Sequence, residues 1–93
     1  MLFNGIVAEP QKENWIDLGN GDWDYYVDGK AYTGWYCAAK DVWYYVRDGH
    51  MVRNDWQWRD ANSAYYLGND GVMVYGPTTV NGYAIDANGL WHK

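Results

Sequence analysis

An aromatic motif recurs along this chain at intervals of close to 20 residues, and this period restricts the possible folds more than any other feature. The copies open on an aromatic residue at separations of 20, 21 and 19, at Trp15, Trp35, Trp56 and Tyr75. Eight residues after each opening come Trp23, Trp43, Ala64 and Tyr83, and two further on come Tyr25, Tyr45, Tyr66 and Ile85. A fixed period of this size indicates a solenoid or array, whose unit cannot bury its apolar face alone.

Each copy also carries a glycine after Asp or Asn, in the pairs Asp28-Gly29, Asp48-Gly49, Asp70-Gly71 and Asn88-Gly89. Short β-rich runs separated by Asp-Gly predict β-hairpins, because a type I′ turn needs positive φ at both central residues. No apolar face with the helical period appears, and glycine interrupts every run. We therefore predict an all-β fold, a solenoid of stacked β-hairpins with a period of about 20 residues.

The spacing of the turn signals places the hairpins. We expect them to turn at Asp28-Gly29, at Asp48-Gly49 and in the longer segment 68–71. The small and polar segments between them are expected to be loops, and these are 38–41, 59–63 and 77–82.

Length and composition indicate one domain held by aromatic packing. The 93 residues include 7 Trp and 10 Tyr, and each aromatic side chain buries roughly 150–250 Å². Stacked repeats of about 20 residues can therefore be stable without a large aliphatic core. We expect about four repeats in residues 15–93, preceded by a leading half-repeat that caps the stack in residues 1–14.

The net charge of −5 argues against a nucleic-acid partner or an anionic membrane surface. No apolar run is long enough to span a membrane, and residues 1–10 do not resemble a secretion signal. If the protein acts outside a cell, we expect this chain to be a fragment or to be released by host lysis. The single cysteine, Cys37, excludes an intramolecular disulfide framework.

Strand alternation determines where the rings point. In an extended run, residues i and i+2 share a face, so Trp43 and Tyr45 project together while Tyr44 projects to the other side. Two interpretations of these rings remain open. They form either the core between repeats or the walls of small aromatic boxes, which suit a quaternary ammonium ion because a cation gains roughly 0.5–2 kcal/mol at each ring face.

The segment Trp43–Met51 (WYYVRDGHM), followed by Trp56, resembles the choline-binding or cell-wall-binding repeat of bacterial and phage lysins and surface proteins. The segment Thr79–Gly89 is also similar to repeats of glucan-binding proteins and large clostridial toxins. The resemblance implies a hairpin solenoid that anchors a lysin or surface protein to the cell wall. It also implies extracellular, cell-surface localisation, with choline of teichoic acid bound between successive copies.

Carried over position by position, the resemblance implies two boxes and one degraded site. The first is walled by Trp35, Trp43 and Tyr66, with Met73 or Met51 as its floor. The second is walled by Trp15, Trp23 and Tyr45, with Met51 or Ala31 nearby. The third keeps Trp56 but has Ala64 and Ile85 in place of its other rings, so we expect it to be degraded.

An enzyme is the competing class, and the residue inventory disfavours it. His50, His92 and Cys37 are scattered, which suits neither a metal site nor a nucleophile with a base, so we predict no catalytic residues, metal or cofactor. Two other binding functions remain as alternatives: a polysaccharide-binding repeat that stacks sugars on its rings, and a structural module without a ligand. We also expect a homodimer through the C-terminal hairpin, where Tyr83, Ile85 and Trp91 are expected to be exposed.

Overall fold

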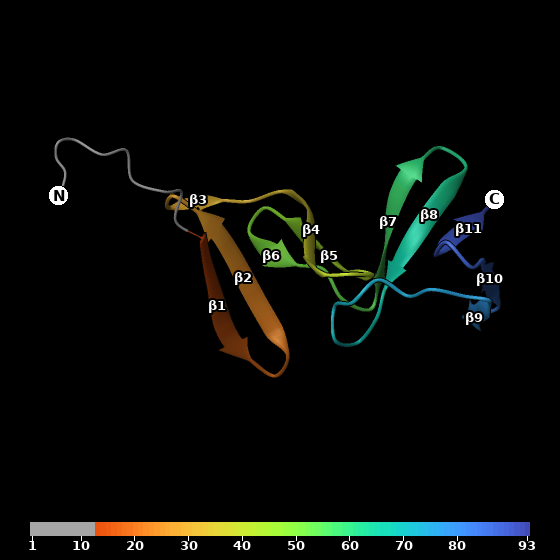
Figure 1. The fold of residues 1–93 in the computed structure, drawn as a ribbon, viewed down its shortest axis with the longest axis horizontal. Coiled ribbons are helices and arrows are strands. Elements are labelled where there is room, and N and C mark those ends of the chain that lie inside the picture. The colour runs from red at the N-terminus through yellow and green to blue at the C-terminus, as the bar shows by residue number, and fades with distance from the viewer. Residues whose placement is uncertain (1–12) are drawn as a thin grey trace, which may run out of the picture.

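The computed structural model describes residues 13–93, and this part of the chain consists of β-strands and turns without helix. Four successive hairpins follow the chain (Figure 1). They are formed by β1 (Glu13–Gly19) with β2 (Asp22–Val27), β4 (Gly34–Ala39) with β5 (Val42–Arg47), β7 (Asp55–Asp60) with β8 (Ser63–Leu67), and β9 (Thr78–Val80) with β10 (Tyr83–Ile85). The remaining strands are short: β3 (Lys30–Ala31), β6 (His50–Met51) and β11 (Leu90–His92).

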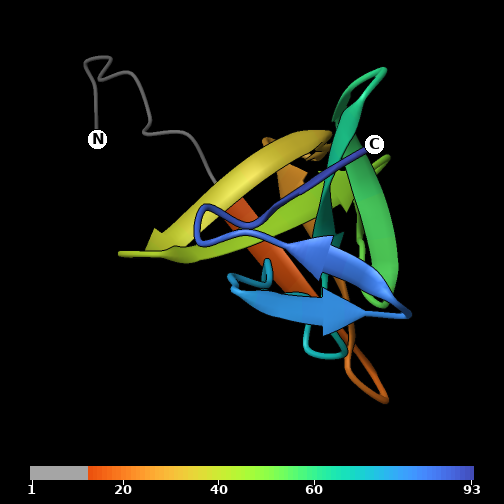
Figure 2. The same ribbon diagram turned by 90° about the vertical axis from the view of Figure 1, so that its right-hand side faces the viewer.

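The hairpins are stacked along one axis. The molecule measures 56 × 26 × 24 Å, and the hairpins succeed one another along its long dimension (Figure 1). Seen along that dimension, each of the first three is turned relative to the one before (Figure 2). The predicted all-β hairpin solenoid is confirmed. The expected cap of residues 1–14 lies outside the described residues, except for its last two, which belong to β1.

The hairpin turns are not all where the sequence predicts them. Segments 38–41 and 59–63, expected to be loops, contain the turns of the β4–β5 and β7–β8 hairpins, and segment 77–82 contains β9. Asp28-Gly29 and Asp48-Gly49 do reverse the chain, but their second strands, β3 and β6, are only two residues long. The reason is that turns of both kinds recur with the same period, so spacing alone does not show which one joins the long strands.

The short return strands join neighbouring hairpins. Strand β6 pairs with β5 of its own hairpin and also with β2, so the first two hairpins share one sheet in the order β1-β2-β6-β5-β4. The backbone N–H of Tyr25 donates to the carbonyl of Gly49 (2.8 Å), and that of Met73 donates to the carbonyl of Trp43 (2.8 Å). Each return segment is thereby fixed against the preceding hairpin, which positions Met51 and Met73 between hairpins.

The aliphatic core is small. Val52, Leu67 and Met73 form a buried cluster, against which Trp35, Trp43, Tyr45 and Tyr65 pack.

Arg53 links distant loops, since its guanidinium donates to the Asp22 carboxylate (2.9 Å) and to the carbonyls of Asn20 (2.7 Å) and Asn69 (3.0 Å). Residues 13–93 include no helix that is long and apolar enough to span a membrane.

Candidate functional site: aromatic cages between hairpins

Each hairpin presents different rings on its two faces. In the β4–β5 ladder, Trp35 is paired with Tyr45, and both lie on the same face as Trp43. Tyr36 is paired with Tyr44 on the opposite face. The stack brings this opposite face against the Trp face of the preceding hairpin, because the rings of Tyr36 and Tyr44 lie 5.3 and 5.9 Å from that of Trp15.

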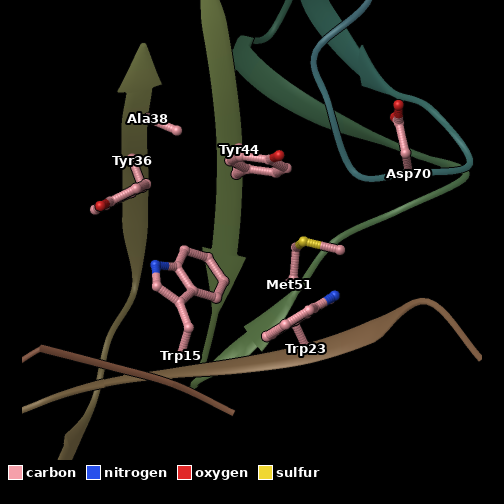
Figure 3. A pocket seen from close by; sticks show the side chains of 7 residues that line it. All are labelled: Trp15, Trp23, Tyr36, Ala38, Tyr44, Met51 and Asp70. Carbon is pink, nitrogen blue, oxygen red and sulfur yellow. The ribbon is translucent and has the colours of Figure 1, made fainter. Parts of the chain in front are cut away.

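The first cage lies between the β1–β2 and β4–β5 hairpins. It consists of Trp15, Trp23, Tyr36, Tyr44 and Met51, whose side chains surround a cavity of about 370 Å³ (Figure 3). The two tryptophan rings lie 6.4 Å apart with an interplanar angle of 80°. Ala38 and Asp70 also line the cavity, and the carboxyl group of Asp70 points away from the rings (Figure 3).

The second cage repeats this arrangement one hairpin later. It consists of Trp35, Trp43, Tyr65, Tyr75 and Met73 around a cavity of about 400 Å³. Its tryptophan rings lie 6.4 Å apart at 85°, and the Tyr65 ring lies 5.3 Å from Trp35, edge to face. Asn88 lines this cavity in place of the aspartate of the first cage. Two cavities with matching ring geometry therefore lie between successive hairpins.

The cage walls are mostly apolar, and Asp70 in the first cage is the charged residue that lines them among the described residues. No Lys, Arg or His of the described residues lines either cavity. Partial burial raises the pKa of Tyr75, and the nearby Asp41 carboxylate raises it further, so its phenol stays neutral at physiological pH. The cages therefore present ring faces, a thioether and no competing positive charge. A cation bearing apolar groups suits such a cavity because it is attracted to ring faces without needing a counter-ion.

The structure brings together most of the residues that the sequence grouped, but not the third ring of either box. Tyr66 lies against Trp56, with ring centroids 4.9 Å apart, and does not line the second cage. Tyr45 lies 5.1 Å from Trp35 and does not line the first cage. Tyr65 and Tyr44, their neighbours in sequence, take those places.

The physical reason is strand alternation in a stack. Tyr45 shares a face with Trp43, so its ring belongs with the tryptophans of its own hairpin. Only the opposite face meets the preceding hairpin, and the residue on that face is Tyr44. The alternation is visible in the sequence, and it identifies Tyr44 and Tyr65 once the face that meets the preceding hairpin is known.

The methionines divide between the cages. Met51 lines the first cage and Met73 lines the second. The sequence offered Met51 or Ala31 for the first of these cages and Met73 or Met51 for the second. Ala31 lines neither cage and lies beside Tyr25 and Tyr32 in a separate hollow.

The region of Trp56 differs from the expected degraded site. Ala64 and Ile85 are buried, with 0% and 1% of their surfaces exposed. Ile85 therefore does not contribute to an exposed C-terminal surface, which corrects its expected exposure, whereas Tyr83 is 49% exposed. Four other rings gather here, and we call them the C-terminal cluster: Trp56, Trp58, Tyr83 and Trp91. The repeat pattern does not identify Trp58, because this residue lies outside the repeat positions.

The polar groups of the described residues do not assemble a reactive centre. Within residues 13–93 no three His, Cys, Asp or Glu side chains are placed to hold a metal ion. Each histidine contacts one aspartate: His50 lies 2.6 Å from Asp24, and His92 lies 3.2 Å from Asp86. Cys37 is exposed, and its thiol donates to the carbonyl of Ala39 (3.1 Å).

Comparison with known proteins finds similarity in sequence and in structure. Residues 50–91 match the family model described as "Choline-binding repeat". The choline binding domain of Spr1274 in Streptococcus pneumoniae is 32% identical, with a TM-score of 0.62, and the match covers 85% of this chain and 93% of that one. A search of curated protein sequences finds no match.

Two longer pneumococcal proteins also match. Choline binding protein F is 34% identical (TM-score 0.61), with 88% of this chain covered, and CbpJ is 36% identical (TM-score 0.60), with 86% covered. The chain spans 27% of each of these structures. Another structure of choline binding protein F was obtained in the presence of a peptidoglycan analogue, a tetrasaccharide-pentapeptide.

Proposed function

Because this chain belongs to the choline-binding repeat family, we propose that the first and second cages are its choline sites. The chain is a choline-binding module of the kind that anchors proteins to the cell wall. Only a non-catalytic choline-binding domain is evident in it. Proteins of this family are cell-surface proteins attached to the bacterial cell wall, and their repeats bind the choline of teichoic acids.

The observation that carries the proposal is the repeated ring geometry. Both cages contain a tryptophan pair 6.4 Å apart at a steep angle, 80° in one and 85° in the other. In both, the next hairpin supplies a tyrosine and its return segment a methionine. Rings held at steep angles enclose a compact group on several sides. The trimethylammonium head of choline is a compact cation of that kind, and its methyl groups can contact the ring faces.

The expected affinity follows from the number of walls. A cation gains roughly 0.5–2 kcal/mol at each ring face, so three faces correspond to millimolar or slightly tighter dissociation constants for free choline. Teichoic acid is a polymer that carries many choline groups, and two cages on one rigid stack raise the effective concentration for the second contact. We propose that this avidity holds a lysin or surface protein on the bacterial envelope.

Calorimetric titration with choline chloride tests the proposal. The wild-type protein should bind choline saturably, Trp23→Ala should remove the first cage, and Trp43→Ala should remove the second. Each variant removes one wall of one cage and leaves the other cage intact, so the two serve as controls for each other. Choline should also raise the melting temperature, because it binds the folded state and not the unfolded chain.

The same titration with glucan or peptidoglycan oligosaccharides tests the alternative ligand. A polysaccharide-binding module should respond to the sugars and not to choline, and a purely structural module should respond to neither. No saturable heat and no rise in melting temperature with choline at tens of millimolar would contradict the proposed function.

A further inference from the structure

The second tryptophan of the third hairpin, Trp58, lies on the first strand of that hairpin, whereas Trp23 and Trp43 lie on the second strands of theirs. In those hairpins the second tryptophan is paired across the ladder with a smaller residue, Trp23 with Asp17 and Trp43 with Cys37. At the same place in the β7–β8 ladder, Ala64 is paired with Trp58. Directly paired residues project from the same face, about 4.5–5.5 Å apart. The third hairpin therefore keeps a large ring on this face but on the neighbouring strand.

A second ring reaches this face from the other side of Ala64. Strand β8 lies between β7 and β11, and Trp91 on β11 is paired with Ala64. Trp58 and Trp91 thus flank Ala64, and their ring centroids lie 5.8 Å apart at 71°. A larger residue at position 64 would occupy the space between these two rings, whereas the methyl group of alanine lies fully buried there.

Trp56 and Tyr83 complete the C-terminal cluster. The Trp56 ring lies 5.9 Å from both Trp91 and Tyr83, at 57° and 90°, and Tyr83 lies 5.3 Å from Trp91 at 74°. With Asp55 and Ala64 these rings line a cavity of about 290 Å³. Trp58 and Tyr83 are half exposed, at 50% and 49%, so the cavity is open to solvent.

We infer that the C-terminal cluster is a third cage that binds a quaternary ammonium ion, an inference that rests on the function proposed above. The ring angles of 57–90° argue for a compact cation, because a sugar ring stacks on a flat platform and these rings enclose a hollow. Asp55 also lines the cavity, and its negative charge so close by favours a positive ligand. Its only cationic partner shown among the described residues is Arg47, at 3.8 Å.

Fluorine NMR of protein labelled with 5-fluorotryptophan resolves the three cages in one titration. The chain has 7 tryptophans, and each resonance is assigned from the corresponding Trp→Phe variant. Titration with choline chloride should shift the resonances of Trp56, Trp58 and Trp91 saturably, in addition to those of the first and second cages. In a protein carrying both Trp23→Ala and Trp43→Ala, the three C-terminal resonances should still shift with an unchanged midpoint.

The outcomes distinguish this inference from the proposed function. Shifts at Trp15, Trp23, Trp35 and Trp43 alone would overturn the third cage and leave the function in place. Shifts at none of the tryptophans would overturn both. If the C-terminal resonances respond to protein dilution and not to choline, these rings pair two copies of the chain, which is the use that the sequence predicts, and the third cage is again overturned.

A substitution at position 58 tests the role of this tryptophan. Trp58→Thr keeps a residue suited to a strand and removes one half-exposed wall. The midpoint of the Trp91 shift should move to about fivefold higher choline, while the midpoints of the first and second cages stay the same. An unchanged Trp91 midpoint in this folded variant would overturn the assignment of Trp58 to the cage.

Discussion

Tyr65 and Trp35 come from successive hairpins, and their rings meet edge to face at 5.3 Å. One hairpin earlier, Tyr36 meets Trp15 edge to face at 5.3 Å, and the tilted ring of Tyr44 lies 5.9 Å from Trp15. The β4–β5 hairpin thus serves two cages: Trp35 and Trp43 line the second cage, and Tyr36 and Tyr44 on its other face line the first. A cage exists only where two hairpins are correctly stacked, so we expect choline binding at the proposed sites to be coupled to folding.

Adjacent tyrosines on β8 should have different effects on the second cage. Tyr65→Leu removes a ring wall of that cage, and we expect calorimetry to show about fivefold weaker choline binding there. Tyr66→Leu is the matched control, since its ring contacts Trp56 and points away from the second cage. Equal weakening by the two variants would contradict the assignment of faces.

Gly71→Ala should weaken the first cage as well as the fold. Gly71 has a φ of +85°, and a Cβ there would lie 2.7 Å from the sulfur of Met51, so Met51 must move. The positive φ should cost roughly 1–2 kcal/mol in unfolding free energy. Gly82→Ala is the control, because its φ is +84° but its Cβ would meet nothing within 4 Å. Both variants should lose stability in denaturant titrations, and only Gly71→Ala should lose affinity at the first cage.

Asp86 should contribute stability that disappears in acid. Its carboxylate accepts hydrogen bonds from the backbone N–H groups of Leu90 and Asn88, both 2.9 Å, and lies 3.2 Å from His92. These contacts, that of Leu90 foremost, lower the pKa of Asp86 below its ordinary value of 3.8. The folded state thus favours the carboxylate, so the stabilisation is fully present above pH 3.8 and is lost as pH falls through the lower, folded pKa.

The measurement compares the wild type with Asp86→Asn in thermal unfolding from pH 6 downward. The difference in melting temperature should be constant near neutrality and shrink in acid. Asp60 also has a lowered pKa, through the backbone N–H of Asn62, and still titrates in the variant, so the difference between the proteins is the informative quantity. If the difference in melting temperature is undiminished at the lowest pH, the ionisation of Asp86 is not its cause.

Restoring the repeat pattern in the third hairpin should not create a site. Ala64→Trp with Ile85→Tyr places two large rings at positions that are 0% and 1% exposed, and overpacking of this kind costs roughly 1–3 kcal/mol. We expect a lower melting temperature and no additional choline site by calorimetry. Ala84→Tyr is the control for overpacking. It also adds a ring at a repeat position, that of Tyr44 and Tyr65, but Ala84 is exposed. A stable double variant with one more site would refute the rearranged cluster.

The sequence by itself determined the architecture and the approximate location of the aromatic cages. The period of the aromatics, together with the Asp-Gly and Asn-Gly turns, is sufficient for a hairpin solenoid, because such turns adopt positive φ readily. In the structure Asp28 and Gly29 have φ values of 51° and 77°. The tryptophan pairs of both cages are also readable from the sequence, and in the structure the two members of each pair lie on the same face of one hairpin.

Only the tertiary structure decided which residues complete each cage. Whether Tyr44 or Tyr45 closes the first cage depends on which face of one hairpin meets the next, and local sequence does not specify that contact. The C-terminal cluster shows this most clearly. Trp58 and Trp91 are 33 residues apart in the chain, yet they meet over Ala64 because β7 and β11 both pair with β8. Pairing between distant strands is fixed by the packing of the whole stack, so the repeat pattern alone predicts a degraded site where the structure gathers four rings.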